Sequence, residues 1–265
     1  RLRRSLQEQD FELAYQPVID MQSGKLSAVE ALIRWRQPDG AELMPGDFIA
    51  AAEASGLIHQ IGEWVIREAC RQHEVWRQAG LPNLRVAVNV SPEQLRRSDV
   101  AGFVQQELEA HGVPPGCIEI EITESAMVEQ SESVQQQLER LRGLGVRLAI
   151  DDFGAGYSSL AQLQRLDVDV IKLDRELVMP LQSGSDAEAL CRAIIWMASA
   201  LGLEVVAEGV ETIEQLRVLA DVGCDELQGY LFSAPLPAAD FESLLRQPRT
   251  AVTDWLGIDE TTVLP

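Results

Sequence analysis

The chain has 265 residues, of which 46% are hydrophobic and 24% are charged, a usage typical of globular proteins and far from that of disordered or fibrous chains. Its 42 acidic and 22 basic residues give a formal net charge of −20, which argues against broad electrostatic attraction to a DNA or RNA polymer or to an anionic lipid surface. A ligand that carries phosphates would therefore need cations at its binding site.

The chain opens with RLRRSLQEQD and without a methionine. We expect residues 1–10 to form a linker helix that continues from an upstream domain. The most apolar run, Ala193–Leu203, is far shorter than the roughly 20 residues that a membrane-spanning helix needs. We therefore expect no direct membrane insertion and a cytoplasmic location, even if the parent protein is membrane-anchored. The four cysteines are far apart and form no CxxC pair, which predicts reduced, buried thiols.

Two strands are predicted first, at Phe11–Ile19 and Leu26–Trp35, joined as a hairpin by DMQSGK with Gly24 in the turn. Six further apolar runs follow: RVAVNV, CIEIEIT, VRLAID, DVIKLD, LEVVAEG and DELQGYLF. Segments with helical spacing separate them, at about 62–80, 100–110, 132–144, 186–201, 212–221 and 239–245. This alternation is typical of a parallel sheet with crossover helices, and with the hairpin it supplies the eight strands of a barrel. We expect one domain over residues 11–247 and a polar, peripheral tail over 248–265.

Nearly every predicted strand carries, at or near its end, a side chain that can bind a metal or move a proton. These residues are Glu30, Asn89, Glu121, Asp151, Asp152, Lys172, Glu208 and Gln228. In a barrel such positions converge on the C-terminal rim, where the loops build the active site. Taken alone, each acid is equally well explained as a helix N-cap or a solvated turn residue. Together, closely spaced carboxylates need compensation, which divalent cations supply.

A donor set made of oxygen atoms favours hard ions such as Mg²⁺ or Mn²⁺. His59, His73 and His111 lie in helical or turn segments and are interpreted as surface residues, which speaks against a zinc site. Two ions about 3.5–4 Å apart would suit a phosphodiester, because they clamp the attacking and the leaving oxygens. Lys172, on an otherwise apolar strand, either orients the attacking water and stabilises developing charge or neutralises an acid inside the barrel.

The order of the motifs points to a family. Glu30-Ala31-Leu32 stands in AVEALIRW and is followed by MPGDFIAAAEASGLI, NVSPEQL, EITES, DDFGAGYSSL, IKLD, AEGVET and LQGYLFSAPLP. Over roughly residues 11–245 the sequence resembles the EAL-domain family of cyclic di-GMP phosphodiesterases. A lone EAL tripeptide would be a weak signal, whereas the ordered set is highly specific. The resemblance implies a modified TIM (β/α)8 barrel with its first strand antiparallel, and hydrolysis of cyclic di-GMP to linear 5′-pGpG.

The resemblance also implies metal ligands and catalytic groups. The ligands of a first ion correspond to Glu30, Asn89, Glu121 and Asp151. Asp151 is shared with a second ion that also involves Asp152, which leaves the strand and reaches that ion from the side. Glu208 corresponds to a second-ion ligand or a proton acceptor, and Lys172 to the residue that positions the hydrolytic water. Catalysis is thus expected from Glu30, Asp152, Lys172 and Glu208.

Further positions correspond to substrate contacts, namely Gln16, Leu32, Arg34, Asn89 and Lys172. The guanidinium of Arg34 suits a phosphate oxygen. Without the resemblance, Gln16, Leu32 and Arg34 would be interpreted as a turn amide, a core leucine and a surface ion pair. Glu211 corresponds to a residue that holds the loop after Asp152, and Gln228 to a residue that supports the ligands at the rim.

The resemblance finally implies a homodimer and an upstream sensory or diguanylate cyclase domain in the parent chain. Two alternatives stay open: a receptor domain that binds cyclic di-GMP without cutting it, and an unrelated metal-dependent barrel such as an enolase-like enzyme. Receptors of this family typically lose metal ligands or the loop, whereas every charged position that hydrolysis requires is present here. We therefore predict an active hydrolase.

Overall fold

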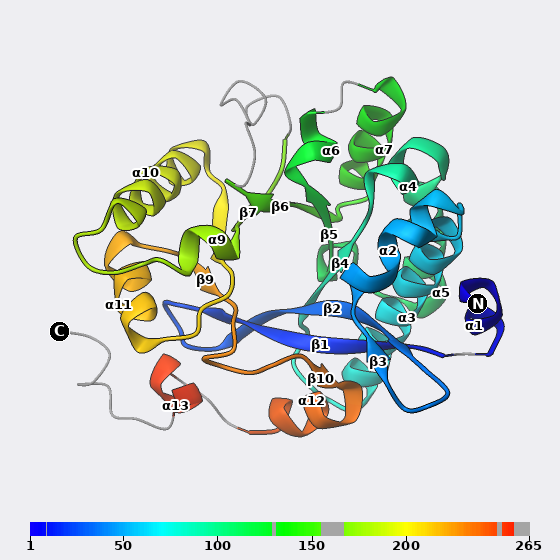
Figure 1. The fold of residues 1–265 in the computed structure, drawn as a ribbon, viewed down its shortest axis with the longest axis horizontal. Helices are drawn as coiled ribbons and strands as arrows, with labels where there is room; N and C mark the ends of the chain where they lie inside the picture. The colour runs from blue at the N-terminus through cyan, green and yellow to red at the C-terminus, as the bar shows by residue number, and fades with distance from the viewer. Residues whose placement is uncertain (9, 129–130, 155–166, 248–250, 257–265) are drawn as a thin grey trace.

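The computed structural model describes residues 1–8, 10–128, 131–154, 167–247 and 251–256 (Figure 1). Its strands are β1 (Phe11–Asp20), β2 (Leu26–Arg36), β3 (Glu42–Leu43), β4 (Arg85–Asn89), β5 (Ile118–Thr123), β6 (Arg147–Phe153), β7 (Val170–Leu173), β8 (Glu204–Ala207), β9 (Glu226–Leu227) and β10 (Leu236–Pro237). Its α-helices are α1 (Leu2–Glu8), α2 (Pro45–Ala54), α3 (Ile58–Gln78), α4 (Pro92–Arg97), α5 (Val100–His111), α6 (Glu124–Val128), α7 (Glu132–Gly143), α9 (Arg175–Val178), α10 (Asp186–Leu201), α11 (Ile213–Val222), α12 (Ala238–Leu245) and α13 (Val252–Leu256). One turn of 3-10 helix, Pro115–Cys117, precedes β5.

Eight strands close a barrel in the order β1, β2, β4, β5, β6, β7, β8, β9, and β9 pairs back with β1. β1 is antiparallel to both of its barrel neighbours, whereas the other barrel pairs are parallel. β3 and β10 extend β2 and β1 outside the barrel. The predicted modified (β/α)8 barrel with an antiparallel first strand is therefore confirmed. The C-terminal ends of all the parallel strands meet at one rim.

The β1–β2 hairpin brings site residues to this rim. Gly24 adopts φ +65° in the turn, a left-handed conformation that costs glycine little because it has no Cβ atom. The resulting register places Gln16 opposite Glu30 and aligns the two strands up to the rim. Because alternate side chains of a strand share a face, Leu32 and Arg34 point to the same side of the sheet as Glu30.

Helices cover the outer face of the barrel (Figure 1), and their ends are fixed by local capping. Ser185 caps the N-terminus of α10, where its hydroxyl accepts a hydrogen bond from the N–H of Glu188, and the left-handed Gly202 caps the C-terminus. α11 begins with a capping box between Thr212 and Gln215. Such caps satisfy backbone groups that a helix end leaves without partners. These caps therefore fix the residues at which the two crossover helices begin and end.

The helix layer buries the thiols and one histidine. All four cysteines are free and buried, as predicted. His73 is only 2% exposed, so the interpretation of this residue as a surface histidine is wrong. It lies on α3 one helical turn from Ala69 and Trp76, which are both buried. The buried face of this helix therefore includes polar residues as well as apolar ones. His59 and His111 are half-buried.

The two ends of the described chain pack on the barrel. In α1, Leu2 and Leu6 lie against the hydrophobic core. In α13, the indole N–H of Trp255 donates to the carbonyl oxygen of Gly24 at 2.9 Å, so this part of the C-terminal tail covers the hairpin turn. Among the described residues, no helix combines the length and the apolar character that a membrane crossing requires.

An ionic network closes the N-terminal end of the barrel. Arg85, the first residue of β4, lies 2.7 Å from Glu226 and 3.0 Å from Glu119. Arg147, the first residue of β6, lies 2.6 Å from Glu204 and 3.3 Å from Glu119. Burial raises the pKa of Glu226, and Arg85 opposes that rise. Positive and negative charges nearly balance here, as expected of an end that serves stability.

Replacing Arg85 by methionine tests this network. We expect the free energy of unfolding to fall by about 3 kcal/mol, because Glu226 would lose its counter-charge while buried and Glu119 would keep only Arg147. Urea unfolding followed by circular dichroism measures the change. Arg71→Met is the matched control, because Arg71 and its partner Glu68 lie at the surface of α3 with side chains 47% and 27% exposed. A loss for Arg85→Met no larger than that of the control would contradict the prediction.

Candidate active site

A buried lysine lies at the centre of the C-terminal rim. The Nζ atom of Lys172, on β7, is 2.6 Å from Glu208 and 2.7 Å from Glu121. It is also 3.4 Å from Asp151 and 3.5 Å from Glu30. Only 2% of the lysine side chain is exposed. The ends of β2, β5, β6, β7 and β8 therefore bring their charged side chains to one point.

Glu30 is held by a chain of amides. Its two carboxylate oxygens accept hydrogen bonds from Asn89 at 2.8 Å and from Gln228 at 2.6 Å. The same Gln228 amide nitrogen also donates to Gln16 at 3.1 Å, and Gln16 donates to the carbonyl oxygen of Ser233 at 3.2 Å. Gln228 thus contacts Glu30 directly, which agrees with its predicted position at the rim. The hairpin and the chain after β9 are tied together through these side chains.

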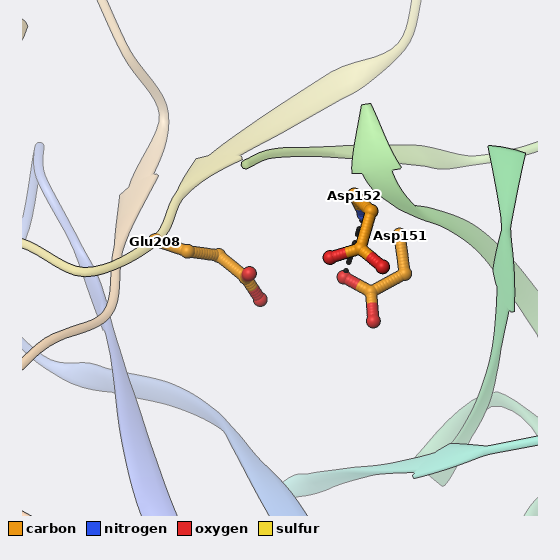
Figure 2. A group of neighbouring side chains, drawn as sticks. All are labelled: Asp151, Asp152 and Glu208. Atoms are coloured by element: carbon orange, nitrogen blue, oxygen red, sulfur yellow. Dashed lines mark hydrogen bonds between the residues drawn. The ribbon is translucent and has the colours of Figure 1, made fainter. Parts of the chain in front are cut away.

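The two aspartates at the end of β6 turn toward the same space. Asp152 has φ 55° and is the only residue other than glycine with positive φ in the described chain. Its N–H donates to the carboxylate of Asp151 at 3.0 Å. Figure 2 shows both carboxylates on one side, facing Glu208 across the rim. Oxygen atoms of the three residues lie within 4.8 Å of one another, although adjacent residues of a regular strand would point to opposite faces.

The cluster carries more negative charge than Lys172 can balance. Burial alone would lower the pKa of Lys172, but the carboxylates around it outweigh burial and hold that pKa well above its ordinary value. Burial, followed by the charge of Glu30, raises the pKa of Glu121 well above its ordinary value. Burial and the charges of Asp151 and Glu30, opposed by Lys172, raise the pKa of Glu208 to about 8. The site therefore contains carboxyl groups that hold protons near neutral pH.

Desolvation, with the charges of Asp151 and Asp174, raises the pKa of Asp152 to about 6. Glu30 differs, because Lys172 and its amide donors outweigh its burial and its pKa is lowered. Burial thus raises the pKa of each of these carboxyl groups, and in Glu30 the charge of Lys172 and the hydrogen-bond donors reverse its effect.

The residues fit divalent cations. One oxygen of Glu121, Oε2, is buried and has no hydrogen-bond partner among the described residues, which costs free energy unless another group approaches it. Asp151, Asp152 and Glu208 offer a second set of oxygen atoms close together. Carboxylates and one amide are the donors that hard ions prefer. No ordinary protein cation other than Lys172 reaches these oxygens in the described structure.

The predicted substrate residues of the hairpin lie beside this cluster. Gln16, Leu32 and Arg34 share the inward face of the hairpin with Glu30. Arg34 is buried and Leu32 is half-buried, so neither is a simple surface residue. Their contact with a substrate stays a prediction.

Glu211 pairs with Arg175 at 2.8 Å, and its side chain is 40% exposed. Its expected contact with the loop after Asp152 falls on residues 155–166, outside the described chain. Sequence reasoning missed a different residue at the start of this loop. Glu124 is buried, and its carboxylate accepts a hydrogen bond from the N–H of Gly154 at 3.1 Å. Its three-residue spacing from Glu121 across the end of β5 is the signal that could have found it.

Asp174 was also missed. It caps α9 by accepting a hydrogen bond from the N–H of Glu176 at 2.6 Å, and it contacts Asp152. Its place after Lys172 in VIKLD resembles an ordinary helix cap, which is why the sequence alone did not distinguish it.

A family model described as EAL domain matches residues 1–235. The chain belongs to the EAL domain family. It is 45% identical over 248 residues to the cyclic di-GMP phosphodiesterase NbdA of Pseudomonas aeruginosa, covering 94% of this chain and 32% of that protein. It is 40% identical over 237 residues to the bifunctional diguanylate cyclase/cyclic di-GMP phosphodiesterase MucR of the same species, covering 89% and 35%. This EAL chain thus spans about a third of the length of these curated relatives.

A solved structure of the phosphodiesterase PaMucR in complex with c-di-GMP superposes on this EAL domain with a TM-score of 0.86. The two are 40% identical, and the match covers 91% of this chain and 97% of that one. The family and fold that the sequence motifs predicted are therefore confirmed.

We expect Glu208 to make cation binding depend on pH. Its pKa of about 8 exceeds its ordinary value of 4.5, so without metal its contribution to stability is full below about 4.5 and is lost as the pH rises through 8. A cation needs the deprotonated carboxylate, so its stabilising effect grows over the same interval. We expect Mn²⁺, compared with EDTA, to raise the melting temperature more at pH 8 than at pH 6.

Differential scanning fluorimetry at both pH values measures this difference. Glu208→Gln should remove most of the pH dependence, whereas Glu109→Gln on the surface of α5 should keep it. Equal Mn²⁺ effects at the two pH values in the unmodified protein would show that the prediction is wrong.

Proposed function

We propose that this EAL domain is a two-metal phosphodiesterase that hydrolyses cyclic di-GMP to linear 5′-pGpG. The observation that carries the proposal is the convergence of four carboxylates on buried Lys172, with Asp152 beside them as a fifth. The relatives named as cyclic di-GMP phosphodiesterases support the substrate and the reaction. The PaMucR complex supports binding of the same nucleotide by this fold.

Two Mg²⁺ or Mn²⁺ ions are proposed for the site. Glu30, Asn89, Glu121 and Asp151 would hold one of them. Asp151, Asp152 and Glu208 would hold the other. When bound, such ions make a water molecule nucleophilic and neutralise charge on a phosphate group.

The protein groups then act around the scissile phosphate. Glu30 and Glu121 hold the Lys172 ammonium in place from one side, so its N–H donors are oriented to align the attacking water and to stabilise charge on the phosphate oxygens. Glu208 is 2.6 Å from the same ammonium, and its deprotonated carboxylate would hold the second ion or accept a proton from the attacking water. Arg34 is proposed to bind a phosphate oxygen, and Gln16 and Leu32 to contact the nucleotide.

A receptor that binds cyclic di-GMP without cutting it is the main alternative. The charge of the rim disfavours it, because five carboxylates facing one lysine would repel a ligand with two phosphates. Cations remove that repulsion and also supply the chemistry. A pure binding site would gain nothing from keeping Asp152 in a left-handed conformation.

Hydrolysis is tested by incubating the domain with cyclic di-GMP and Mg²⁺ or Mn²⁺ and measuring 5′-pGpG by chromatography. Glu30→Ala should abolish turnover, because it removes a ligand and a partner of Lys172. Asp152→Asn should lose the second ion and lower the rate by about 100-fold or more. Glu109→Gln is the control and should keep the full rate. Binding without turnover by the unmodified protein, with both metals and in a confirmed dimer, would favour the receptor instead.

We also propose a homodimer and, in the parent chain, an upstream sensory or diguanylate cyclase domain in the cytoplasm. The partial coverage of the relatives and the bifunctional description of MucR support a longer parent chain. The outer face of α10 supports self-association, because Trp196 is 81% exposed and Leu190 is 49% exposed there. Ala189 and Ala193, also exposed, continue the apolar surface between them.

Trp196→Glu should shift the protein from dimer to monomer at micromolar concentration, because it places a charge in the centre of this apolar surface. Sedimentation velocity over a range of protein concentrations measures the shift. Val75→Glu is the matched control, since Val75 is an exposed apolar residue on α3, 38% exposed. An unmodified protein that stays monomeric, or a Trp196→Glu dimer as stable as the control, would contradict this proposal.

A further inference from the structure

The guanidinium of Arg34 is held at two of its three nitrogen atoms. Its Nη1 donates to the carbonyl oxygen of Ile33 at 2.9 Å, and its Nε lies 3.5 Å from the carboxylate of Glu42. Among the described residues, Nη2 has no hydrogen-bond or ion-pair partner recorded in the structure. A guanidinium presents five N–H donors in a rigid plane, so contacts at two of its nitrogen atoms determine where the third one points.

Two carboxylates compete for this guanidinium. Burial tends to lower the pKa of Arg34, and the charge of Glu42 opposes that effect more strongly than those of Tyr230 and Glu30. Glu30 lies inside the acidic cluster, whereas Glu42 lies outside it with a side chain 48% exposed. Glu42 therefore counteracts the attraction that would draw Arg34 inward among the metal ligands.

The backbone around Glu42 is well fixed. Antiparallel pairing places Glu42 opposite Arg36, at the end of β2. The connecting turn is closed by a hydrogen bond from the N–H of Gln37 to the carbonyl oxygen of Ala41 at 2.7 Å. On the other side, the N–H of Met44 donates to Asp47 at 2.9 Å at the start of α2. Glu42 is thus carried by a short strand anchored at both ends.

We infer that Glu42 is a positioning residue for substrate binding, which holds the Nε atom of Arg34 so that Nη2 stays turned toward the phosphate of the nucleotide. The inference rests on the proposed function, in which Arg34 binds cyclic di-GMP. Glu42 pairs with Arg34, and we propose no contact between Glu42 and the reacting phosphate. Its effect falls on affinity and not on the chemical step.

The kinetic constants of three variants test the inference. Glu42→Ala should raise KM about fivefold, the scale expected when one long side chain loses its preorganised position, and should leave kcat within about twofold. Glu42→Gln should restore most of the affinity, because its amide oxygen keeps an acceptor beside Nε. Glu12→Gln is the matched control, since Glu12 pairs with Arg36 on the same hairpin with both side chains about half exposed, and it should leave both constants unchanged.

Two results would overturn the inference while the unmodified protein remains active. One is an unchanged KM for Glu42→Ala. The other is an equal fall in KM for Glu42→Ala and Glu42→Gln, which would mean that the carboxylate only competes with the phosphate. If the unmodified protein binds cyclic di-GMP without turnover, dissociation constants from calorimetry replace KM and the same outcomes apply. An unmodified protein that neither binds nor cleaves the nucleotide would instead overturn the proposed function, and this inference with it.

Discussion

The contact between one buried ammonium and the carboxylates around it is the interaction on which the site depends. Lys172 lies within 3.5 Å of four acidic side chains that arrive from different strands. Its charge keeps these strand ends together, but it cannot balance them, because carboxylates at such distances raise one another's pKa. The cluster is stable only with some acids protonated or with cations bound. In a chain of net charge −20, this is how an acidic surface can accept a phosphate-bearing ligand.

The two ends of the barrel differ in the balance of their charges. At the N-terminal end, Arg85 and Arg147 alternate with Glu119, Glu204 and Glu226, so each charge has an opposite neighbour. At the C-terminal end, in contrast, four carboxylates surround Lys172 alone. The same strands carry both ends. The excess charge is therefore a property of the rim and not of the fold, which marks the rim as functional.

The barrel and the central residues of its site could be predicted because they rest on strong local patterns. Valine and isoleucine runs mark β4 to β8, and an acid or amide at the end of a run falls on the rim whatever the details of packing. Glu124 and Asp174 were not predicted as site residues, because their role depends on contacts across the rim with Gly154 and Asp152. His73 was wrongly predicted to be a surface residue, because its burial depends on which other elements pack against α3.

The short strand β3 lacks any periodicity, since it has two residues and is defined by its pairing with β2 alone. Its position, and with it that of Glu42, could not be read from the sequence.

Burial within the cluster is graded from its inner to its outer side chains. Glu121 and Lys172 are at most 2% exposed, and Glu30 is held by two amides. Asp151 and Glu208 are 14% and 19% exposed, and Asp152 lies where the pairing of β6 with β7 is interrupted. After it, Phe153 pairs with Leu173 of β7, and Gly154 adopts φ +100°, a conformation that favours glycine. The inner oxygens are therefore fixed by the barrel itself, whereas the position of Asp152 depends on how Glu124 and α9 hold the chain that follows it.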